Sequence, residues 1–334
     1  MGDEAKCELS RSRAATSPES DENTGGGAAR RARREVLRTS DGVRIEAAYE
    51  PFAGAARGPA VDRLPSAIVL AHGFSGSVDR PAVRRAAQVF AQYGAVITFS
   101  FRGHGNSGGR STVGDREVFD LAAAVCWARS MGHEHVATVG FSMGGSVVVR
   151  HGALYPPYGT GRGDRPVGAD EGRAAPSALP APDGPASGTA ASTAPPAMNG
   201  VRQPSPHADV VVAVSAPARW YYRGTAPMRR VHWVIERPVG RLISRYGLRT
   251  RIHPYDWDPV PLSPVAAAPS LAPRPLLVVH GDQDTYFPLD HPRSLAEAAD
   301  PECSELWLIP GFGHAENAAA PSLLHRIGGW ITAR

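Results

Sequence analysis

Cysteine is scarce in this chain, with only Cys7, Cys126 and Cys303 among 334 residues. They are scattered, and no two of them stand at the close spacing of a cysteine metal site. The pattern is typical of a reduced protein, so we expect a cytoplasmic location. It also predicts no metal, and nothing else in the sequence indicates a cofactor.

Long apolar runs are missing too. No uninterrupted run approaches the roughly 18 residues that a membrane-spanning helix needs. The first residues, Met1–Lys6, are polar and acidic and lead into no apolar segment of the kind found in secretory signals. We therefore expect neither an integral membrane span nor a secretory signal.

Basic residues are not arranged as in a nucleic-acid-binding surface. The net charge is +4, and much of the basic excess lies in arginines at the termini and within residues 219–251. No basic stripe interleaved with aromatic residues is present, so we expect solvated faces and no nucleic-acid partner. With 42% hydrophobic residues, the length allows one large α/β domain with added segments.

Composition divides the chain into unequal parts. Residues 1–34 lack apolar periodicity and are predicted to be a disordered tail, and the Pro-, Gly- and Ala-rich residues 156–207 a disordered insertion. The main domain is expected at 35–155 and 208–334. Within it, residues 218–268 hold many aromatic and arginine side chains. We predict a small, mainly helical cap there, because a solvent-facing excursion would expose too much apolar surface.

Apolar strands alternate with helical segments through the main domain, which is typical of a mostly parallel sheet with helices on both faces. A hairpin is expected around Ser40-Asp41-Gly42, and Asp79 is a candidate N-cap for the first helix. The expected strands are 67–71, 95–101, 135–141, 209–215, 276–279 and 305–309, and the expected helices are near 83–90, 115–131, 143–155, 292–299 and 321–332.

The segment Gly140-Phe141-Ser142-Met143-Gly144 lies between one such strand and the following helix. A serine between glycines at a strand-to-helix junction has the pattern of a nucleophile elbow, where a tight turn tolerates little side chain. A serine hydroxyl needs a neighbouring base, and the base needs a carboxylate to orient it.

Several histidines compete for the role of the base. His314 is the strongest candidate because it lies in a loop just after the last strand, in the chain order nucleophile, acid, histidine. His325 and His151 fall within helices and are better suited to surface or core roles. His72 and His104 precede Ser142, and His280 lies where the acid belongs.

The acid is expected in the segment His280–Pro288, because no carboxylate follows the strand at 209–215 before Glu236. Both Asp282 and Asp284 are candidates on this reasoning. Backbone N–H groups must also hold the oxyanion of a tetrahedral intermediate. The expected donors are the N–H of Met143, next to the nucleophile, and that of Phe74 in the loop after strand 67–71.

Five segments together resemble the α/β-hydrolases, and in particular their single-domain esterase and serine-aminopeptidase-like branch. They are His72–Phe74, Phe101–Ser107, Gly140–Gly145, His280–Asp284 and Gly311–His314. The resemblance implies Ser142 as nucleophile, Asp284 as acid and His314 as base, with His104 structural or adjacent to the substrate. Relatives that cleave haloalkanes or epoxides use an aspartate where this chain has Ser142.

The resulting expectation is a serine hydrolase that cleaves a small-molecule carboxylic ester, with thioesters and small amides open because they share the triad chemistry. Acyl transfer on the same triad is one alternative. A non-catalytic ligand-binding protein on the same scaffold is another, because fold does not imply function. The sequence does not indicate an oligomeric state.

Overall fold

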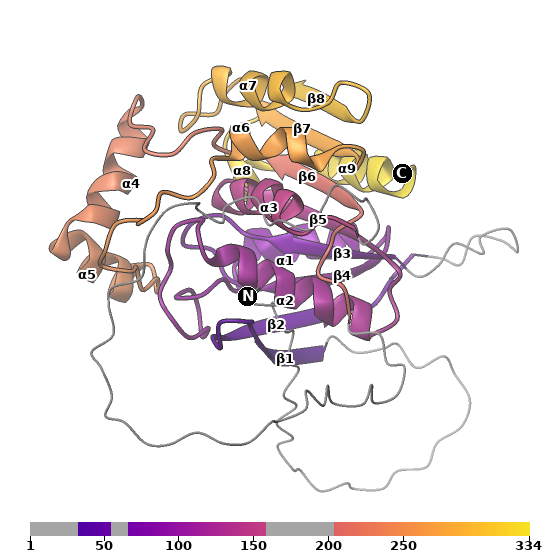
Figure 1. Ribbon diagram of the computed structural model, residues 1–334, viewed down its shortest axis with the longest axis horizontal. Coiled ribbons are helices and arrows are strands. Elements are labelled where there is room, and N and C mark those ends of the chain that lie inside the picture. Colours follow the sequence, from indigo (N-terminus) through magenta and orange to yellow (C-terminus); the bar gives the residue numbers. More distant parts are fainter. Residues whose placement is uncertain (1–32, 55–65, 158–203) are drawn as a thin grey trace, which may run out of the picture.

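Eight strands form one sheet at the centre of the computed structural model (Figure 1), which describes residues 33–54, 66–157 and 204–334. Their order across the sheet is β1-β2-β4-β3-β5-β6-β7-β8. β1 pairs with β2, and β2 with β4, in antiparallel fashion, and all further neighbours are parallel. The predicted mostly parallel α/β sheet is confirmed.

The strands are β1 (Arg33–Arg38), β2 (Arg44–Glu50), β3 (Ser66–Ala71), β4 (Ala95–Phe99), β5 (His135–Phe141), β6 (Val210–Val214), β7 (Leu276–Gly281) and β8 (Ser304–Ile309). The helices are α1 (Pro81–Phe90), α2 (Glu117–Ser130), α3 (Met143–Leu154), α4 (Ala226–Glu236), α5 (Pro238–Gly247), α6 (Pro264–Ala267), α7 (Asp290–Ala298), α8 (Ala315–Ala318) and α9 (Pro321–Thr332), with a short 3₁₀ helix at Ala268–Leu271. Along the part of the chain described, none of these helices is long and apolar enough to cross a membrane.

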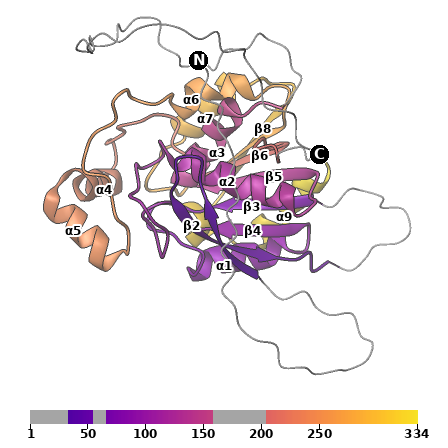
Figure 2. The same ribbon diagram turned by 60° about the horizontal axis from the view of Figure 1, so that its bottom comes forward.

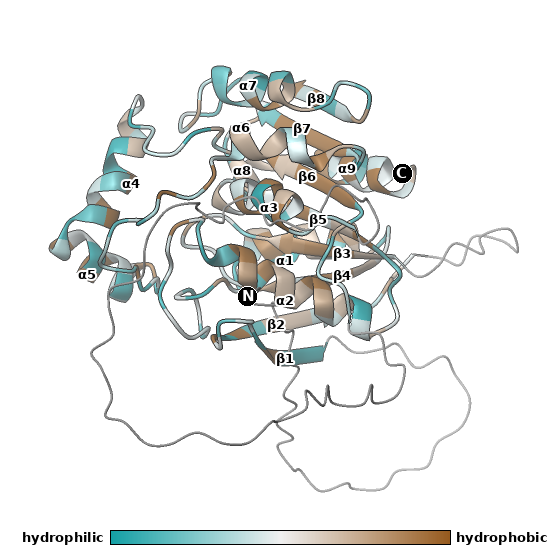
Figure 3. Ribbon diagram, viewed as in Figure 1, coloured by the Kyte–Doolittle hydropathy of each residue, from teal (hydrophilic) through white to brown (hydrophobic). Residues whose placement is uncertain are grey.

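The core is divided by the sheet into two layers. Along β3, Ala67, Val69 and Ala71 face the layer that contains residues of α2 and α3, whereas Ile68 and Leu70 face the layer with α1 and α9. This alternation follows from the two-residue period of a strand. Both faces are covered by helices, as Figure 2 shows, so the central strands β3 to β7 are buried and largely apolar, and Figure 3 colours them mostly brown.

Some element boundaries and caps differ from the sequence-based predictions. β1 begins at Arg33 and so takes in the last two residues of the predicted 1–34 tail, the rest of which lies outside the described residues. Most of the predicted insertion at 156–207 lies outside them as well. The N-cap position of α1 is Arg80, without a side-chain cap, because the carboxylate of Asp79 pairs with Arg34 of β1 instead.

Helices α4 and α5 form a pair that projects from one end of the sheet, at the left of Figure 1, and they lie within the predicted cap. The remainder of residues 218–263 is mostly loop. The expectation that the cap would avoid apolar exposure is wrong for α5. The side chains of Val239, Leu242, Ile243 and Tyr246 are all exposed, because the helix approaches α4 at Gly240, and its buried Ser244 donates to the Thr250 carbonyl.

Arg102 joins three separate parts of the fold below the carboxyl edge of the sheet. Its guanidinium donates to Asp41, in the turn between β1 and β2, at 2.7 Å and to Asp120 of α2 at 2.8 Å. The Arg102 backbone N–H also donates to Asp120 at 2.8 Å. Arg102 and Asp120 are both buried, so each needs the other to compensate its charge.

Replacing Arg102 by methionine should lower the free energy of unfolding by about 3–5 kcal/mol, since it leaves the Asp120 carboxylate buried without its partner. Urea unfolding followed by circular dichroism measures this loss. Arg110→Met is the matched control: Arg110 is exposed, and its replacement should change the unfolding free energy by no more than about 0.5 kcal/mol. Equal unfolding midpoints for the two variants would contradict the assigned role of Arg102.

Candidate active site

Ser142 stands at the turn between β5 and α3 with a backbone φ of 51°, in a region that non-glycine residues rarely adopt. The turn is crowded. A Cβ added at Gly140 would strike the carbonyl oxygen of Gly144, and one added at Gly144 would strike that of Ala71 at the end of β3. Glycine is therefore required at both positions, and the backbone holds the Ser142 side chain at the carboxyl edge of the sheet.

Three side chains from three separate loops meet at this edge. The Oγ of Ser142 lies 2.9 Å from Nε2 of His314, which follows β8. The Nδ1 of His314 lies 2.8 Å from Oδ2 of Asp284, which follows β7. Because an ionised carboxylate only accepts hydrogen bonds, Nδ1 carries the proton and leaves Nε2 to accept from the Ser142 hydroxyl.

Asp284, rather than Asp282, makes the contact with His314. The Asp284 side chain is buried, and its Oδ1 accepts the N–H groups of Tyr286 at 2.8 Å and Phe287 at 3.1 Å. Burial raises the pKa of Asp284, but the hydrogen bond and charge interaction with His314 and the hydrogen bond from the Phe287 N–H outweigh it and hold the pKa below its usual value. Asp282 is exposed and accepts the Gly311 N–H at 2.7 Å, which ties the loop after β7 to the histidine loop.

The loop after β3 is held from both sides at Gly73. Phe101 N–H donates to Nε2 of His72 at 3.0 Å, so Nδ1 of His72 carries the ring proton and donates to the Gly73 carbonyl at 2.7 Å. Burial, together with the neighbouring His104, lowers the pKa of His72 to about 3, which keeps this ring neutral. His72 therefore orients the loop and is not a base.

On its other side, the Gly73 N–H donates to Oε1 of Glu316 at 3.1 Å. Glu316 is buried two residues after His314, and burial raises its pKa. The site is compact here: a Cβ added at Gly73 would lie 3.3 Å from both the Glu316 carboxylate and Cβ of Ser142. Glu316 is thus a part of the site that the sequence reasoning missed.

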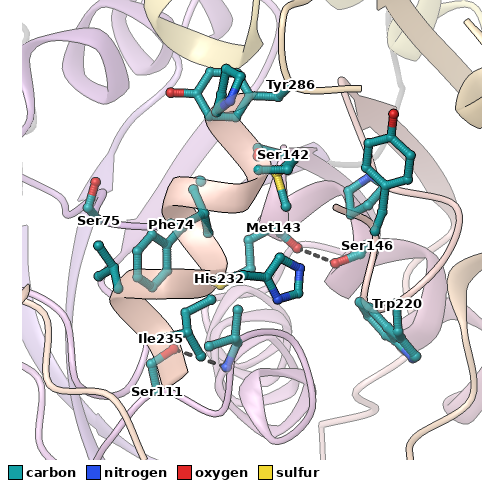
Figure 4. Close-up of a pocket in the computed structure, with 18 of the residues that line it drawn as sticks. Phe74, Ser75, Ser111, Ser142, Met143, Ser146, Trp220, His232, Ile235 and Tyr286 are labelled. Atoms are coloured by element: carbon teal, nitrogen blue, oxygen red, sulfur yellow. Dashed lines mark hydrogen bonds between the residues drawn. The ribbon is translucent and has the colours of Figure 1, made fainter. Parts of the chain in front are cut away.

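The N–H of Met143 is the first of α3 and has no acceptor within the helix. The Phe74 N–H makes no hydrogen bond with any residue that the structure describes. Both residues line the same cavity as Ser142 and His314. Figure 4 shows Ser142 and Met143 between Phe74 on one side of this cavity and Trp220 on the other.

The other candidate histidines serve the fold. His104 is buried, with Nδ1 3.0 Å from the Arg102 carbonyl oxygen, and its ring packs edge-on against those of His72 and Phe74. His325 contacts the hydroxyl of Tyr93, and His151 is buried within α3. His280 lies beneath Asp284 and donates to the Phe287 carbonyl at 2.8 Å.

Ser142 opens into a cavity of about 550 Å³, within the range of small-molecule sites. Its walls are largely aromatic and aliphatic, with contributions from Trp220, Tyr221, Tyr222, Trp257 and Tyr286. Helix α4 supplies Val231, His232, Val234 and Ile235, so the cap closes one side of the cavity. Among the residues that the structure describes, no group of three or more histidine, cysteine or acidic side chains is arranged to hold a metal.

Comparison with known proteins identifies the fold. Residues 68–322, more than half of the chain, match the alpha/beta hydrolase family. The chain belongs to this family. A search of curated proteins found no match.

Solved alpha/beta hydrolase structures are similar over nearly the whole chain. The Pyrococcus furiosus esterase Pf2001 is 17% identical, with a TM-score of 0.58 over 95% of this chain and 98% of its own. The alpha/beta hydrolase GrgF from Penicillium sp. is 14% identical, with a TM-score of 0.56 over 91% and 98%. The esterase domain of a Rhodothermus marinus protein is 16% identical, with a TM-score of 0.52 over 91% and 97%. At these identities the likeness establishes the fold alone.

One further residue of this hydrolase site had no clear sequence signal. Ser215 follows β6, where sequence reasoning noted only the absence of a carboxylate, and its Oγ accepts the Ala315 N–H at 3.1 Å. Ala315 has a φ of 54° and directly follows His314. Ser215 therefore anchors the loop that carries the histidine.

For Glu316 the sequence did offer one signal: it is the single acidic residue in the run Ala315–Ala320, where the other residues are Asn317 and alanines.

Proposed function

We propose that this protein is a serine hydrolase that cleaves carboxylic esters through Ser142, His314 and Asp284. The observation that carries the proposal is the chain of contacts from Ser142 Oγ to His314 Nε2, at 2.9 Å, and from His314 Nδ1 to Asp284, at 2.8 Å. Thioesters and small amides share this chemistry. The esterases among the similar structures are consistent with the same reaction class.

In the proposed reaction, Ser142 Oγ attacks the acyl carbon while His314 Nε2 takes its proton, and Asp284 stabilises the imidazolium that forms. The tetrahedral intermediate collapses and releases the alcohol, which receives the proton from His314. Water then enters, loses a proton to His314 and attacks the acyl carbon, and the acid is released as Ser142 recovers its hydrogen. The cavity walls favour an ester with a sizeable apolar group.

The negative charge of the intermediate falls on the former carbonyl oxygen, and the Met143 and Phe74 N–H groups are the proposed donors to it. Glu316 is the proposed positioning residue for this site. By accepting the Gly73 N–H, it fixes the peptide that precedes Phe74, while His72 fixes the Gly73 carbonyl. The loop is thereby prepared before substrate binds, which is the condition for electrostatic stabilisation of a transition state.

Triad variants test the proposed reaction with a panel of short- and long-chain aryl esters. Ser142→Ala, His314→Ala and Asp284→Asn should each lower kcat by about 10³-fold or more, because the three side chains act as a unit. Asp282→Asn is the matched control. Its amide oxygen still accepts the Gly311 N–H, so kcat should stay close to that of the wild type.

Undiminished hydrolysis by His314→Ala would contradict the assignment of His314 as the base. An equal loss in Asp282→Asn and Asp284→Asn would remove the distinction between the two aspartates. Transfer of the acyl group from Ser142 to an added alcohol in preference to water would identify an acyltransferase.

Two substitutions of Glu316 test its positioning role. Glu316→Gln keeps an oxygen that accepts the Gly73 N–H, whereas Glu316→Leu removes the acceptor at similar volume. We expect Glu316→Leu to lower kcat by about tenfold to a hundredfold with little change in KM, since a displaced oxyanion donor acts on the transition state. Glu316→Gln should recover most of the rate. If the glutamine variant loses as much kcat as the leucine variant, the accepted hydrogen bond is not the reason for the loss.

A further inference from the structure

Helix α5 presents its large apolar side chains to solvent. Val239, Leu242, Ile243 and Tyr246 have exposed fractions of 60%, 57%, 50% and 72%. They stand at positions i, i+3, i+4 and i+7, so they form one continuous face of the helix, here called the apolar stripe. The opposite face carries the buried Gly240 and Ser244. An exposed stripe of this kind marks an interaction surface.

Arginines border the apolar stripe. Arg237, Arg241 and Arg245 follow one another at four-residue spacing, which places them between the buried face of α5 and the stripe. Figure 3 shows teal and brown residues side by side on this helix. Arg241 donates to the carbonyl oxygens of Ile235 and Glu236, while Arg237 and Arg245 make no ion pair with any residue that the structure describes.

The surrounding segment has the same sign of charge. Residues 218–268 contain nine arginines and only three carboxylates, Glu236, Asp256 and Asp258. The Glu236 carboxylate already pairs with the side chains of Arg223 and His232. The partner that matches such a surface is apolar at its centre and negatively charged at its rim.

We propose that α5 docks this protein on an anionic phospholipid bilayer, with the apolar stripe at the boundary of the acyl chains and the arginines at the phosphates. A helix with a basic polar border and an exposed apolar face lies in the plane of a membrane interface in this way. Arginine stems extend along the apolar surface and keep their charged ends in water. Each basic residue near an anionic surface adds to the attraction.

A second copy of the chain fits the surface less well. Two stripes placed face to face would bring two sets of unpaired arginines of the same charge together. The ten-residue helix is also only about 15 Å long, so the stripe is far smaller than the roughly 800 Å² per partner of a stable interface.

Docking through α5 places the cavity next to the lipid. α5 packs on α4, and α4 lines the cavity with Val231, His232, Val234 and Ile235. No residue from 237 to 247 lines the cavity itself. The substrate class that follows, which rests on the proposed function, is an acyl ester of an amphiphile that resides in the bilayer.

Co-sedimentation of the full chain carrying Ser142→Ala with vesicles measures docking separately from catalysis. We expect binding to vesicles of phosphatidylcholine mixed with phosphatidylserine, and weak binding to phosphatidylcholine alone. Leu242→Ser with Ile243→Ser should weaken binding about tenfold or more, as should Arg237→Gln with Arg245→Gln. The matched controls are Val36→Ser on the exposed β1 and Arg116→Gln with Arg293→Gln, and they should bind like the parent chain.

Equal binding by the stripe variants and the controls, or no binding to mixed vesicles, would overturn the docking surface. Light scattering would also overturn it if it showed a dimer that the double substitution Leu242→Ser and Ile243→Ser converts to a monomer.

With Ser142 intact, this double substitution should slow hydrolysis of a long-chain ester embedded in mixed vesicles about tenfold and leave hydrolysis of a water-soluble short-chain ester unchanged. Equal slowing of both would indicate damage to the fold. Vesicle binding without hydrolysis of any ester would support the docking surface and contradict the proposed function.

Discussion

The backbone at Ser142 is held in a left-handed conformation because three strand ends and one helix crowd together around it. Gly144 approaches the carbonyl oxygen of Ala71 at the end of β3, and Gly145 approaches Ala216 after β6. Larger side chains at these positions would force α3 away from the sheet. The N-terminus of α3 and the loop after β3 take their places from this contact. The geometry of the site therefore depends on a close approach of backbones at the elbow.

Local signals made much of this arrangement predictable. The strand-to-helix alternation, the glycines around Ser142 and the chain order of acid and histidine are all visible in short windows of sequence. The choice between Asp282 and Asp284 needed the motif, since both stand in one loop. Glu316 was missed because its partner, Gly73, lies 243 positions away, and no periodicity links the two. Asp79 was predicted as an N-cap from local preference, but the pairing with Arg34 of β1 prevailed.

The cap has two sides of different chemistry, and only one was anticipated. The expectation that aromatic side chains would close over the sheet fits α4 and the loops with Trp220 and Trp257, which line the cavity. It does not fit α5, where Gly240 faces α4 and large residues face solvent. Hydrophobicity alone does not say which face of a helix packs against its neighbour. That choice depends on how closely two backbones approach, which Gly240 allows here.

Labelling with a serine-reactive fluorophosphonate, followed by peptide mass spectrometry, tests directly whether Ser142 is the nucleophile. The hydroxyl of Ser142 should attack phosphorus because His314 Nε2 lies 2.9 Å away to take its proton. We expect one label per chain, on the peptide that contains Ser142, and its loss in Ser142→Ala. A wild-type chain that takes up no label, or a Ser142→Ala variant that labels as well as the wild type, would contradict it.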